Sequence, residues 1–347
     1  MFDTDYNIIF SFISSFLVTY LAIPKLIFFA DRYGLTDVAG KRASHEGSVP
    51  IFGGIAIFAG VMLAFLFWSQ LVNVQFIMAS LFIVFFVGLV DDLLGLNPYK
   101  KLIGQIIAVL VIIYLGDMQI DNMHGVLGVY EISDFTATLF TIFVVVVITN
   151  GFNLIDGVDG LASGLGLISS FCFGLLAVFM GQYNMAIIAF SLMGALLAFL
   201  KFNFPPARIF MGDTGSLLVG MILSVLAINL IDRGLVLNTI NFPNKGPLLS
   251  IAILAIPLFD SLRVFIARVV KNRHPLYPAR DHFHHALLRL GIGHQRTSLI
   301  LYVLSIALIL ASCLLLKLNI NIAIALLAVI SFTTLLVPFF IRKKDIK

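Results

Sequence analysis

Five short polar segments interrupt an otherwise apolar chain, and they hold side chains that bind metal ions and phosphates. They are KRASHEG at 41–47, VDDLLGLNPYKK at 90–101, NLIDGVDG at 153–160, FMGDTGSL at 210–217 and RHPLYPARDHFHH at 273–285. Carboxylate oxygens are ligands of Mg²⁺, while arginine, lysine and histidine side chains bind phosphates. This combination indicates phosphoryl transfer, which needs positioning and charge neutralisation more than covalent work by the protein.

The adjacent carboxylates Asp91 and Asp92 are difficult to explain as structural residues, because like charges repel each other. A metal ion, a phosphate-binding lysine or a proton-acceptor role would explain the pair. Lys101, ten residues further on, could neutralise the two carboxylates or hold a phosphate. The alternative is a solvated helix end.

Asn153, Asp156 and Asp159 follow one another at intervals of three. If the segment stays helical, successive members are neighbours on one face and their oxygens converge. Gly157 and Gly160 would then let the backbone approach a ligand closely. The alternative is a helix end followed by a glycine turn, with Asp159 capping the next helix.

Asp213 lies between two glycines, immediately before an apolar run. Mg²⁺ is usually held by one or two carboxylates together with substrate phosphates, a task that suits Asp213. The alternative is that Asp213 or Thr214 only caps the following helix.

Histidines gather in the last polar segment, as HFHH at 282–285 with Arg280 beside it. No cysteine accompanies them and no HExxH motif is present, so anion binding is favoured over a zinc site. A surface loop with accidental histidines is the alternative. His294 is expected to be structural.

The composition requires a membrane protein, because 60% of the residues are hydrophobic and only 12% are charged, against about 25% charged in soluble domains. Apolar runs long enough to span a bilayer recur throughout, with no soluble domain between them. We therefore expect one all-α integral membrane domain, 1–347, with about eleven spans. Their approximate ranges are 6–30, 51–70, 75–90, 102–116, 135–152, 160–180, 185–200, 215–232, 248–270, 298–316 and 320–341.

The lysines and arginines give the expected orientation. With eleven spans, 19 of the 22 fall on one side of the membrane, which the positive-inside rule makes the cytoplasmic side. The N-terminus is then outside, the C-terminus is cytoplasmic, and all five polar segments face a cytoplasmic cleft. The net charge of +4 reflects this bias and does not indicate nucleic-acid binding.

Taken together, the motifs resemble a known enzyme family. They are VPIFGGIAI after Arg42 and His45, the Asp91–Asp92 pair with Lys101, NGFNLIDGVDGLASG, FMGDTGSL, IPLFDSLRV at 256–264, and RDHFHH. The chain resembles the polyprenyl-phosphate N-acetylhexosamine-1-phosphate transferases, of glycosyltransferase 4 type. Within that family it is most similar to the bacterial undecaprenyl-phosphate GlcNAc-1-phosphate transferases of the WecA and TagO branch.

The resemblance implies transfer of GlcNAc 1-phosphate from UDP-GlcNAc to undecaprenyl phosphate, with release of UMP. The lipid-linked diphosphosugar would initiate cell-envelope polysaccharide synthesis at the bacterial inner membrane. The implied cofactor is Mg²⁺, with Mn²⁺ also open, and the implied partners are the two substrates and membrane lipids, with a homodimer left open.

The resemblance also implies a role for each matched residue. Asp213 and Asn153 would hold the metal, Asp156 would be catalytic, and Asp159 would contact the uracil. The remaining matches are Asp91, Asp92 and Lys101 near the lipid phosphate, Arg280, His282, His284 and His285 around the sugar and diphosphate, and Arg42 and His45 as further substrate contacts. Ala43 and Ala279 depart from the usual lysine and aspartate of the family.

Two alternatives remain at this point. HFHH resembles the GlcNAc branch, whereas the MurNAc-pentapeptide branch reads HHH, and other donors such as QuiNAc, FucNAc or bacillosamine derivatives stay open. A membrane transporter or flippase is the alternative from another class, because intramembrane acids often mark ion pathways. It predicts acids in mid-span, and Asp260 is the nearest example.

Overall fold

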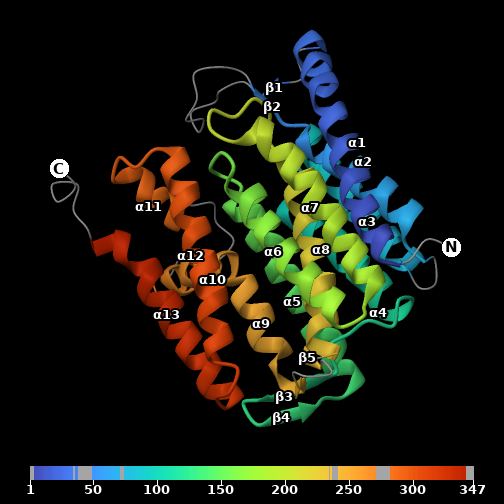
Figure 1. Cartoon of the computed structure of the whole chain (residues 1–347). Coiled ribbons are helices and arrows are strands. Elements are labelled where there is room, and N and C mark those ends of the chain that lie inside the picture. The colour runs from blue at the N-terminus through green and yellow to red at the C-terminus, as the bar shows by residue number, and fades with distance from the viewer. Residues whose placement is uncertain are drawn as a thin grey trace.

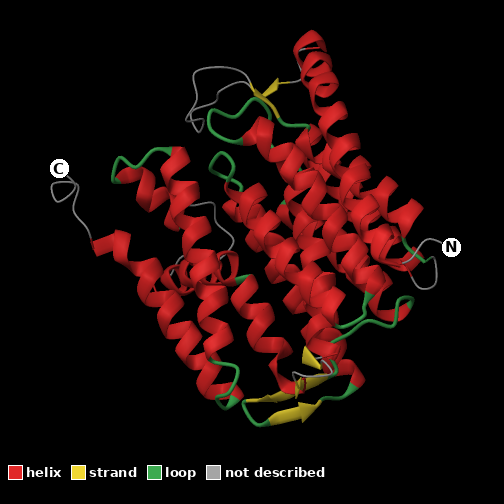
Figure 2. Cartoon of the chain, viewed as in Figure 1, coloured by secondary structure: helices red, strands yellow, loops and turns green. Residues whose placement is uncertain are grey.

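The computed structural model describes residues 4–33, 36–37, 49–70, 74–233, 235–236, 241–270 and 282–340. Within these ranges the chain is a bundle of helices with short strands at its two ends (Figures 1 and 2). The helices are α1 Thr4–Tyr33, α2 Gly53–Trp68, α3 Val74–Leu94, α4 Pro98–Tyr114, α5 Asp134–Ile155, α6 Leu161–Phe179, α7 Tyr183–Asn203, α8 Gly212–Arg233, α9 Gly246–Ile253, α10 Ala255–Val270, α11 Phe283–Arg289, α12 His294–Leu314 and α13 Ile320–Phe340. The expected all-α membrane fold is confirmed.

The strands form three antiparallel pairs that connect helices. β1 (Thr36–Asp37) pairs with β2 (Val49–Pro50), and β5 (Leu235–Val236) pairs with β6 (Asn241–Phe242), just before a 3₁₀ turn at Pro243–Lys245. The hairpin of β3 (Asn122–Val126) and β4 (Val129–Glu131) lies at the end of the bundle opposite β1 and β2 (Figure 1). The strands therefore contribute little to the core.

Each of the eleven expected ranges coincides with helix. In the described part of the chain, eight helices are long and apolar enough to cross a membrane, and nine spans result if α9 and α10 form one broken span. α2 and α4, with 16 and 17 residues, are shorter than a usual span.

The expected continuous span over 248–270 is wrong in one respect, because the structure has two helices there. α9 and α10 meet at an angle of 79°, and the break falls at Leu254. Pro257 follows in the first turn of α10, where its missing N–H would otherwise bond to the carbonyl of Ile253 in a continuous helix. The proline therefore explains why the helix restarts here.

α8 is the central helix, and nearly all of its side chains from Thr214 to Leu230 are buried. Glycines let three neighbouring helices approach its backbone closely. A Cβ at Gly54 of α2 would lie 2.3 Å from the backbone nitrogen of Gly215, and one at Gly88 of α3 would lie 2.5 Å from the Cα of Thr214. On its other side, a Cβ at Gly220 would lie 2.6 Å from the Cα of Thr149 in α5. Small residues allow such packing where no hydrophobic force acts between helices in lipid.

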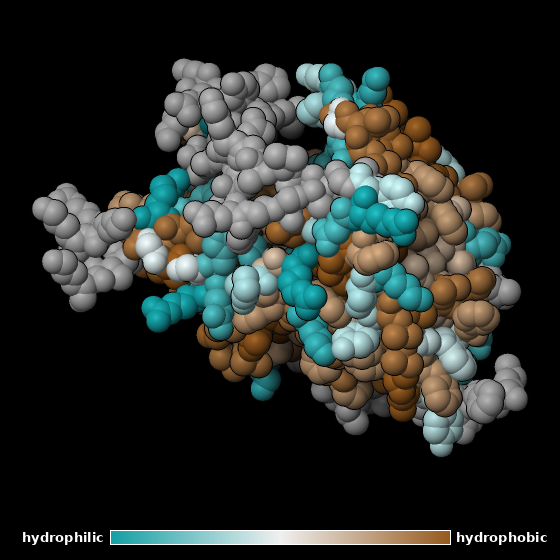
Figure 3. Space-filling model, turned by 90° about the horizontal axis from the view of Figure 1, so that it is seen from above, coloured by the Kyte–Doolittle hydropathy of each residue, from teal (hydrophilic) through white to brown (hydrophobic). Residues whose placement is uncertain are grey.

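The end of the bundle that carries β1, β2 and α11 holds the polar segments that the structure describes, which are 90–101, 153–160, 210–217 and 282–285. Seen from this end, hydrophilic side chains gather on the face, and hydrophobic ones lie along the flank of the bundle (Figure 3). Many side chains on the flanking helices are exposed and large, as expected of a lipid-facing surface, for example Phe28, Phe67 and Phe143.

We expect Gly88→Val to destabilise the protein, because the new side chain overlaps the α8 backbone and forces α3 outward. The thermal unfolding midpoint in detergent should fall by about 3 °C or more. Phe86→Leu, which changes an exposed side chain two residues earlier on α3, is the control and should leave the midpoint unchanged. A Gly88→Val midpoint equal to wild type would contradict the close packing of α3 on α8.

Candidate active site

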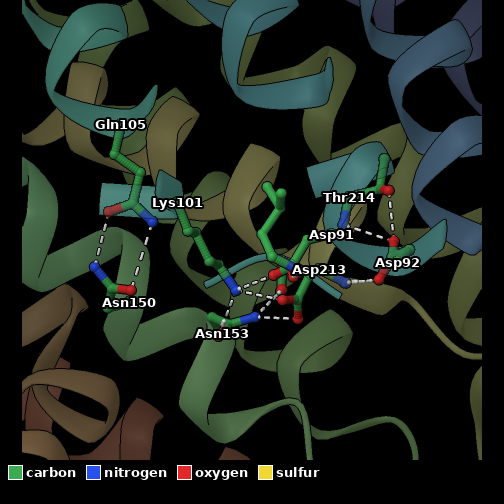
Figure 4. Close-up of polar contacts among 10 residues, drawn as sticks. Asp91, Asp92, Lys101, Gln105, Asn150, Asn153, Asp213 and Thr214 are labelled. Atoms are coloured by element: carbon green, nitrogen blue, oxygen red, sulfur yellow. Dashed lines mark hydrogen bonds and ion pairs between the residues drawn. The ribbon is translucent and has the colours of Figure 1, made fainter. Parts of the chain in front are cut away.

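Side chains from four helix ends meet at the polar end of the bundle (Figure 4). Asp91 and Asp92 come from the last turn of α3, Lys101 from the first turn of α4, Asn153 from the last turn of α5, and Asp213 from the first turn of α8. Three of the sequence-predicted segments thus contribute to one cluster.

Lys101 is the centre of this cluster. Its Nζ lies 3.0 Å from Oδ2 of Asp91 and donates to Oδ2 of Asp213 and, at 3.3 Å, to Oδ1 of Asn153. An ammonium group has three donors, so all three have acceptors here. The side chains of Lys101 and Asp91 are each only 12% exposed, which makes the pairing stronger than at an open surface.

Asn153 links α5 to the start of α8. Its Nδ2 donates to Oδ1 of Asp213 at 2.6 Å and to Oγ of Ser216 at 2.9 Å. One carboxylate oxygen of Asp213 therefore accepts from the Asn153 amide, and the other accepts from the Lys101 ammonium. The carboxylate is held in a defined orientation by two other helices.

Asp92 caps α8. It accepts hydrogen bonds from the backbone N–H of Asp213 at 2.7 Å, from the N–H of Thr214 at 2.9 Å and from Oγ1 of Thr214 at 2.5 Å. A helix start leaves its first N–H groups unpaired, and a carboxylate there is favourable. Capping by Asp213 or Thr214 had been the structural alternative, but Asp92 supplies the cap from α3.

Gly212 allows this capping geometry. Its φ is +71°, and a Cβ at this position would lie 2.6 Å from both Oδ2 of Asp92 and the carbonyl oxygen of Ile51. Both the backbone conformation and the space exclude a side chain.

The segment NLIDGVDG leaves the helix at its centre. α5 ends at Ile155, Asp156 has φ −76° and ψ 44°, and Gly160 has φ +76°. The expectation that Asn153, Asp156 and Asp159 share one helical face is therefore wrong, and the helix end with a glycine turn is correct. Asp159 does not cap α6, since Gly160 occupies that position.

Asp156 lies in this turn, outside the membrane-spanning helices, and its carboxyl has a pKa well above the usual range. Burial disfavours the charged form, and the nearby carboxylates of Asp213, Asp92 and Asp159 raise the pKa further. Such perturbed groups are typical of functional sites.

Asp159 is only 4% exposed and faces protein groups. Its Oδ2 accepts from the N–H of Ala207 at 3.1 Å, and Oδ1 lies 3.4 Å from Nδ1 of His294. The predicted contact with uracil is untested, but in this structure the carboxylate binds the turn to neighbouring segments.

Helix α12 supports the same turn, which the sequence alone did not indicate. His294 contacts Asp159, Ser298 Oγ donates to the Asp159 carbonyl at 2.8 Å, and Tyr302 OH donates to the Gly160 carbonyl. Their spacing of four residues places them on one helical face. That spacing was visible in the sequence, but nothing there identified the turn as the partner.

The histidine segment is anchored by Asp260 of α10. Its Oδ2 lies 2.9 Å from Nδ1 of His282, and its Oδ1 accepts from the Phe283 N–H at 2.9 Å and from Nη2 of Arg263 at 3.0 Å. Asp260 is 1% exposed. Its buried charge is thus paired on every side, as a carboxylate in an apolar bundle requires.

His284 connects the histidines to the turn that contains Asp156 and Gly157. Its Nε2 is buried without a hydrogen-bond partner, and a Cβ at Gly157 would lie 3.1 Å from that nitrogen. Burial, with a smaller effect of His285, lowers the pKa of His284 to about 3, so the ring is neutral. The rings of His284 and His285 lie 4.3 Å apart.

Three predicted site residues, Arg42, His45 and Arg280, lie outside the described residues.

The oxygens around the Lys101 ammonium could also bind a hard cation such as Mg²⁺, because two carboxylates and one amide carbonyl already surround a positive charge there. In the described ranges, no group of three or more His, Cys, Asp or Glu side chains forms a metal site alone. A Mg²⁺ ion here would therefore need substrate oxygens as further ligands.

Comparison with known proteins gives consistent results. The model of glycosyl transferase family 4 matches residues 74–231, which run from α3 through α8 and contain the Lys101 cluster. The chain is 34% identical to the decaprenyl-phosphate N-acetylglucosaminephosphotransferase of Mycolicibacterium smegmatis, covering 82% of this chain and 76% of that protein.

Two further relatives carry similar names. A probable undecaprenyl-phosphate N-acetylglucosaminyl 1-phosphate transferase of Bacillus subtilis is 31% identical, over 86% of this chain and 82% of its own length. The undecaprenyl-phosphate alpha-N-acetylglucosaminyl 1-phosphate transferase of Escherichia coli O157:H7 is 30% identical, over 86% and 80% respectively.

We expect Asp156→Asn to stabilise the metal-free protein at neutral pH. A carboxyl whose pKa is raised on folding holds its proton more tightly in the folded state, so its ionisation costs stability as the pH rises. The midpoint of the variant in chelator should exceed that of wild type by about 2 °C or more at pH 8, with a smaller difference at pH 5. Asp121→Asn, at an exposed position, is the control. An Asp156→Asn midpoint that shows no pH-dependent advantage would disprove the raised pKa.

Proposed function

Since the chain belongs to glycosyl transferase family 4, in the family of the polyprenyl-phosphate N-acetylglucosamine-1-phosphate transferases, we propose that it transfers GlcNAc 1-phosphate from UDP-GlcNAc to undecaprenyl phosphate. The reaction releases UMP and forms a lipid-linked diphosphosugar that begins cell-envelope polysaccharide synthesis. The relatives are named for decaprenyl phosphate or for undecaprenyl phosphate, so the length of the acceptor is part of the proposal.

The observation that carries the proposal is the cluster around Lys101. Four helix ends bring two carboxylates, an amide and an ammonium together within hydrogen-bond distance at the polar end of an apolar bundle. A lipid acceptor lies in the bilayer and a nucleotide sugar comes from water, so their phosphates can meet only at such a border. The cluster is built for charge neutralisation at that place.

Asp213 and Asn153 are the residues that would hold Mg²⁺, with the donor diphosphate completing its ligands. The ion would neutralise charge on that diphosphate. Lys101 already contacts Asp213, so its ammonium lies where it can bind phosphate oxygens next to the metal-binding carboxylate.

The chemistry we propose is direct attack by an oxygen of the lipid phosphate on the β-phosphorus of UDP-GlcNAc. The new P–O bond forms as the bond to the bridging oxygen breaks, and that oxygen leaves with UMP. A phosphate monoester has a second pKa near 6, so the lipid phosphate is largely dianionic at neutral pH and needs no base.

Asp91 and Asp92 then have different tasks. Both carboxylate oxygens of Asp92 accept hydrogen bonds from backbone N–H groups at the start of α8. Asp92 therefore fixes Asp213 in place. Asp91 accepts from the Leu96 N–H at 2.6 Å and orients the ammonium of Lys101. His284 approaches the turn that contains Asp156 at Gly157, and we place the sugar phosphate beside this histidine segment.

For the membrane arrangement, we propose eleven spans with the N-terminus outside and the C-terminus in the cytoplasm of a bacterial cell. The eleven spans include the short helices α2 and α4 and the broken pair α9 and α10. The distribution of lysine and arginine supports this orientation, which places the Lys101 cluster at the cytoplasmic border.

We expect the purified protein to form a lipid-linked product from UDP-GlcNAc and undecaprenyl phosphate in the presence of Mg²⁺. Asp213→Ala should lower kcat by about 100-fold or more, because a group that stabilises transition-state charge is lost. The product is measured by transfer of radiolabel into the lipid phase. The wild-type protein is also tested with a panel of other UDP-N-acetylhexosamines and with both undecaprenyl and decaprenyl phosphate. If it forms no product in any of these assays, the proposed function is refuted.

Direct attack makes a second prediction, that UMP release depends on the acceptor. Without undecaprenyl phosphate, the protein should release less than one UMP per active site from UDP-GlcNAc. A stoichiometric burst of UMP without acceptor would instead indicate a covalent phospho-sugar intermediate on an aspartate.

A further inference from the structure

Gln105 of α4 and Asn150 of α5 form a reciprocal amide pair beside the Lys101 cluster (Figure 4). Nδ2 of Asn150 donates to Oε1 of Gln105 at 2.9 Å, and Nε2 of Gln105 donates back to Oδ1 of Asn150 at 3.5 Å. Gln105 is 1% exposed. The hydrogen bonds of the two amides run to each other and to the Val146 carbonyl, and none of them joins the groups around Lys101.

The orientation of the pair is determined by the backbone. Nδ2 of Asn150 also donates to the carbonyl of Val146, one turn earlier on α5, at 2.8 Å. With the amide turned over, its oxygen would face that carbonyl oxygen, which is unfavourable. Asn150 is therefore held in one orientation, and Gln105 must present its oxygen to the Asn150 nitrogen.

The amide pair and the Lys101–Asn153 hydrogen bond are two contacts between the same helices, α4 and α5. Gln105 lies four residues after Lys101 on α4, and Asn150 lies three residues before Asn153 on α5. These spacings place each pair of residues on one helical face, one turn apart. The two helices thus run in opposite directions, and the amide pair sets the register in which Lys101 meets Asn153.

Of these two contacts between α4 and α5, the amide pair is the one that fixes the register without a charged group. The Lys101 side chain is long and flexible, with rotatable bonds that let its ammonium follow any acceptor. Leaving an amide unpaired in an apolar interior is unfavourable, so α4 cannot slide or rotate on α5 without breaking the pair. The α4 backbone that carries Lys101 is consequently held in one place.

We propose that Gln105 and Asn150 are positioning residues for Lys101 in the transfer reaction. They hold the backbone of α4 against α5, so that the ammonium stays within reach of Asp213 and of the phosphates when the substrates bind. This inference depends on the proposed function for the assay reaction, and it assigns a role to two residues beyond the charged cluster.

The test is a double-mutant cycle on the full-length protein in nanodiscs, with Gln105→Met and Lys101→Gln. Methionine has the length of glutamine but no amide. We expect Gln105→Met to lower kcat about tenfold, with the KM for UDP-GlcNAc within twofold of wild type. In the Lys101→Gln background the same change should lower the residual kcat by less than twofold, because the group that it positions is gone.

A purely structural amide pair gives a different result. The fold-loss from Gln105→Met would then be the same in both backgrounds, and that outcome would overturn the proposal, as would a kcat within twofold of wild type. The exchange variant Gln105→Asn/Asn150→Gln keeps both amides and should recover most of the kcat. If Gln105→Met does not fold, Asn150→Leu is put through the same cycle, with the same two criteria.

Gln119→Leu is the matched control. Gln119 accepts a hydrogen bond from Thr138 near the other end of α5, at 3.4 Å, so this variant removes an amide contact to the same helix far from Lys101. Its kcat should equal that of wild type. A wild-type protein that makes no lipid-linked product would refute the proposed function itself, whereas an active wild type with additive losses would refute only the positioning role.

Discussion

Capping of the start of α8 by Asp92 is the interaction on which the active site depends. A helix cannot satisfy its own first N–H groups, and Asp92 accepts from two of them at the start of α8. Asp92 reaches Asp213 and Thr214 because Gly88 brings α3 against the α8 backbone. Without this cap, the first N–H groups of α8 would lose these acceptors, and the backbone that carries the Asp213 carboxylate would be less firmly held opposite Lys101. Asp92 therefore both joins α3 to α8 and holds the backbone of Asp213.

The adjacent aspartates show why residue type alone does not predict a role. Successive side chains on a helix point about 100° apart, so Asp91 and Asp92 face different neighbours although they share one motif. Asp91 lies on Lys101, and Asp92 lies on the α8 backbone. The sequence predicted that carboxylates and a lysine would meet, and they do. Which carboxylate faces the ammonium depends on helix rotation, which the apolar runs alone did not determine.

The helices themselves were largely predictable, because uninterrupted apolar runs leave few alternatives in a bilayer. The break at Leu254 and the turn after Ile155 were less so. Spacing by three suggested a helical face through Asp156, but glycines allowed the chain to leave the helix. The partners of that turn come from distant helices, with Asn203 accepting from the Gly160 N–H at 3.0 Å. Contacts between segments so far apart leave no local pattern to read.

Support of the turn by α12 has a consequence for the order of events during synthesis. A membrane protein emerges from the ribosome from its N-terminus onward, and early segments fold first. The family-matched segment, 74–231, carries the whole Lys101 cluster, yet the turn at Asp159 lacks its last partners until Ser298 and Tyr302 have been made and inserted. The cluster can assemble early, but the turn at Asp159 gains its last contacts late. A nascent chain stalled before α12 would hold the charged residues in place while the turn at Asp159 lacked its contacts to α12.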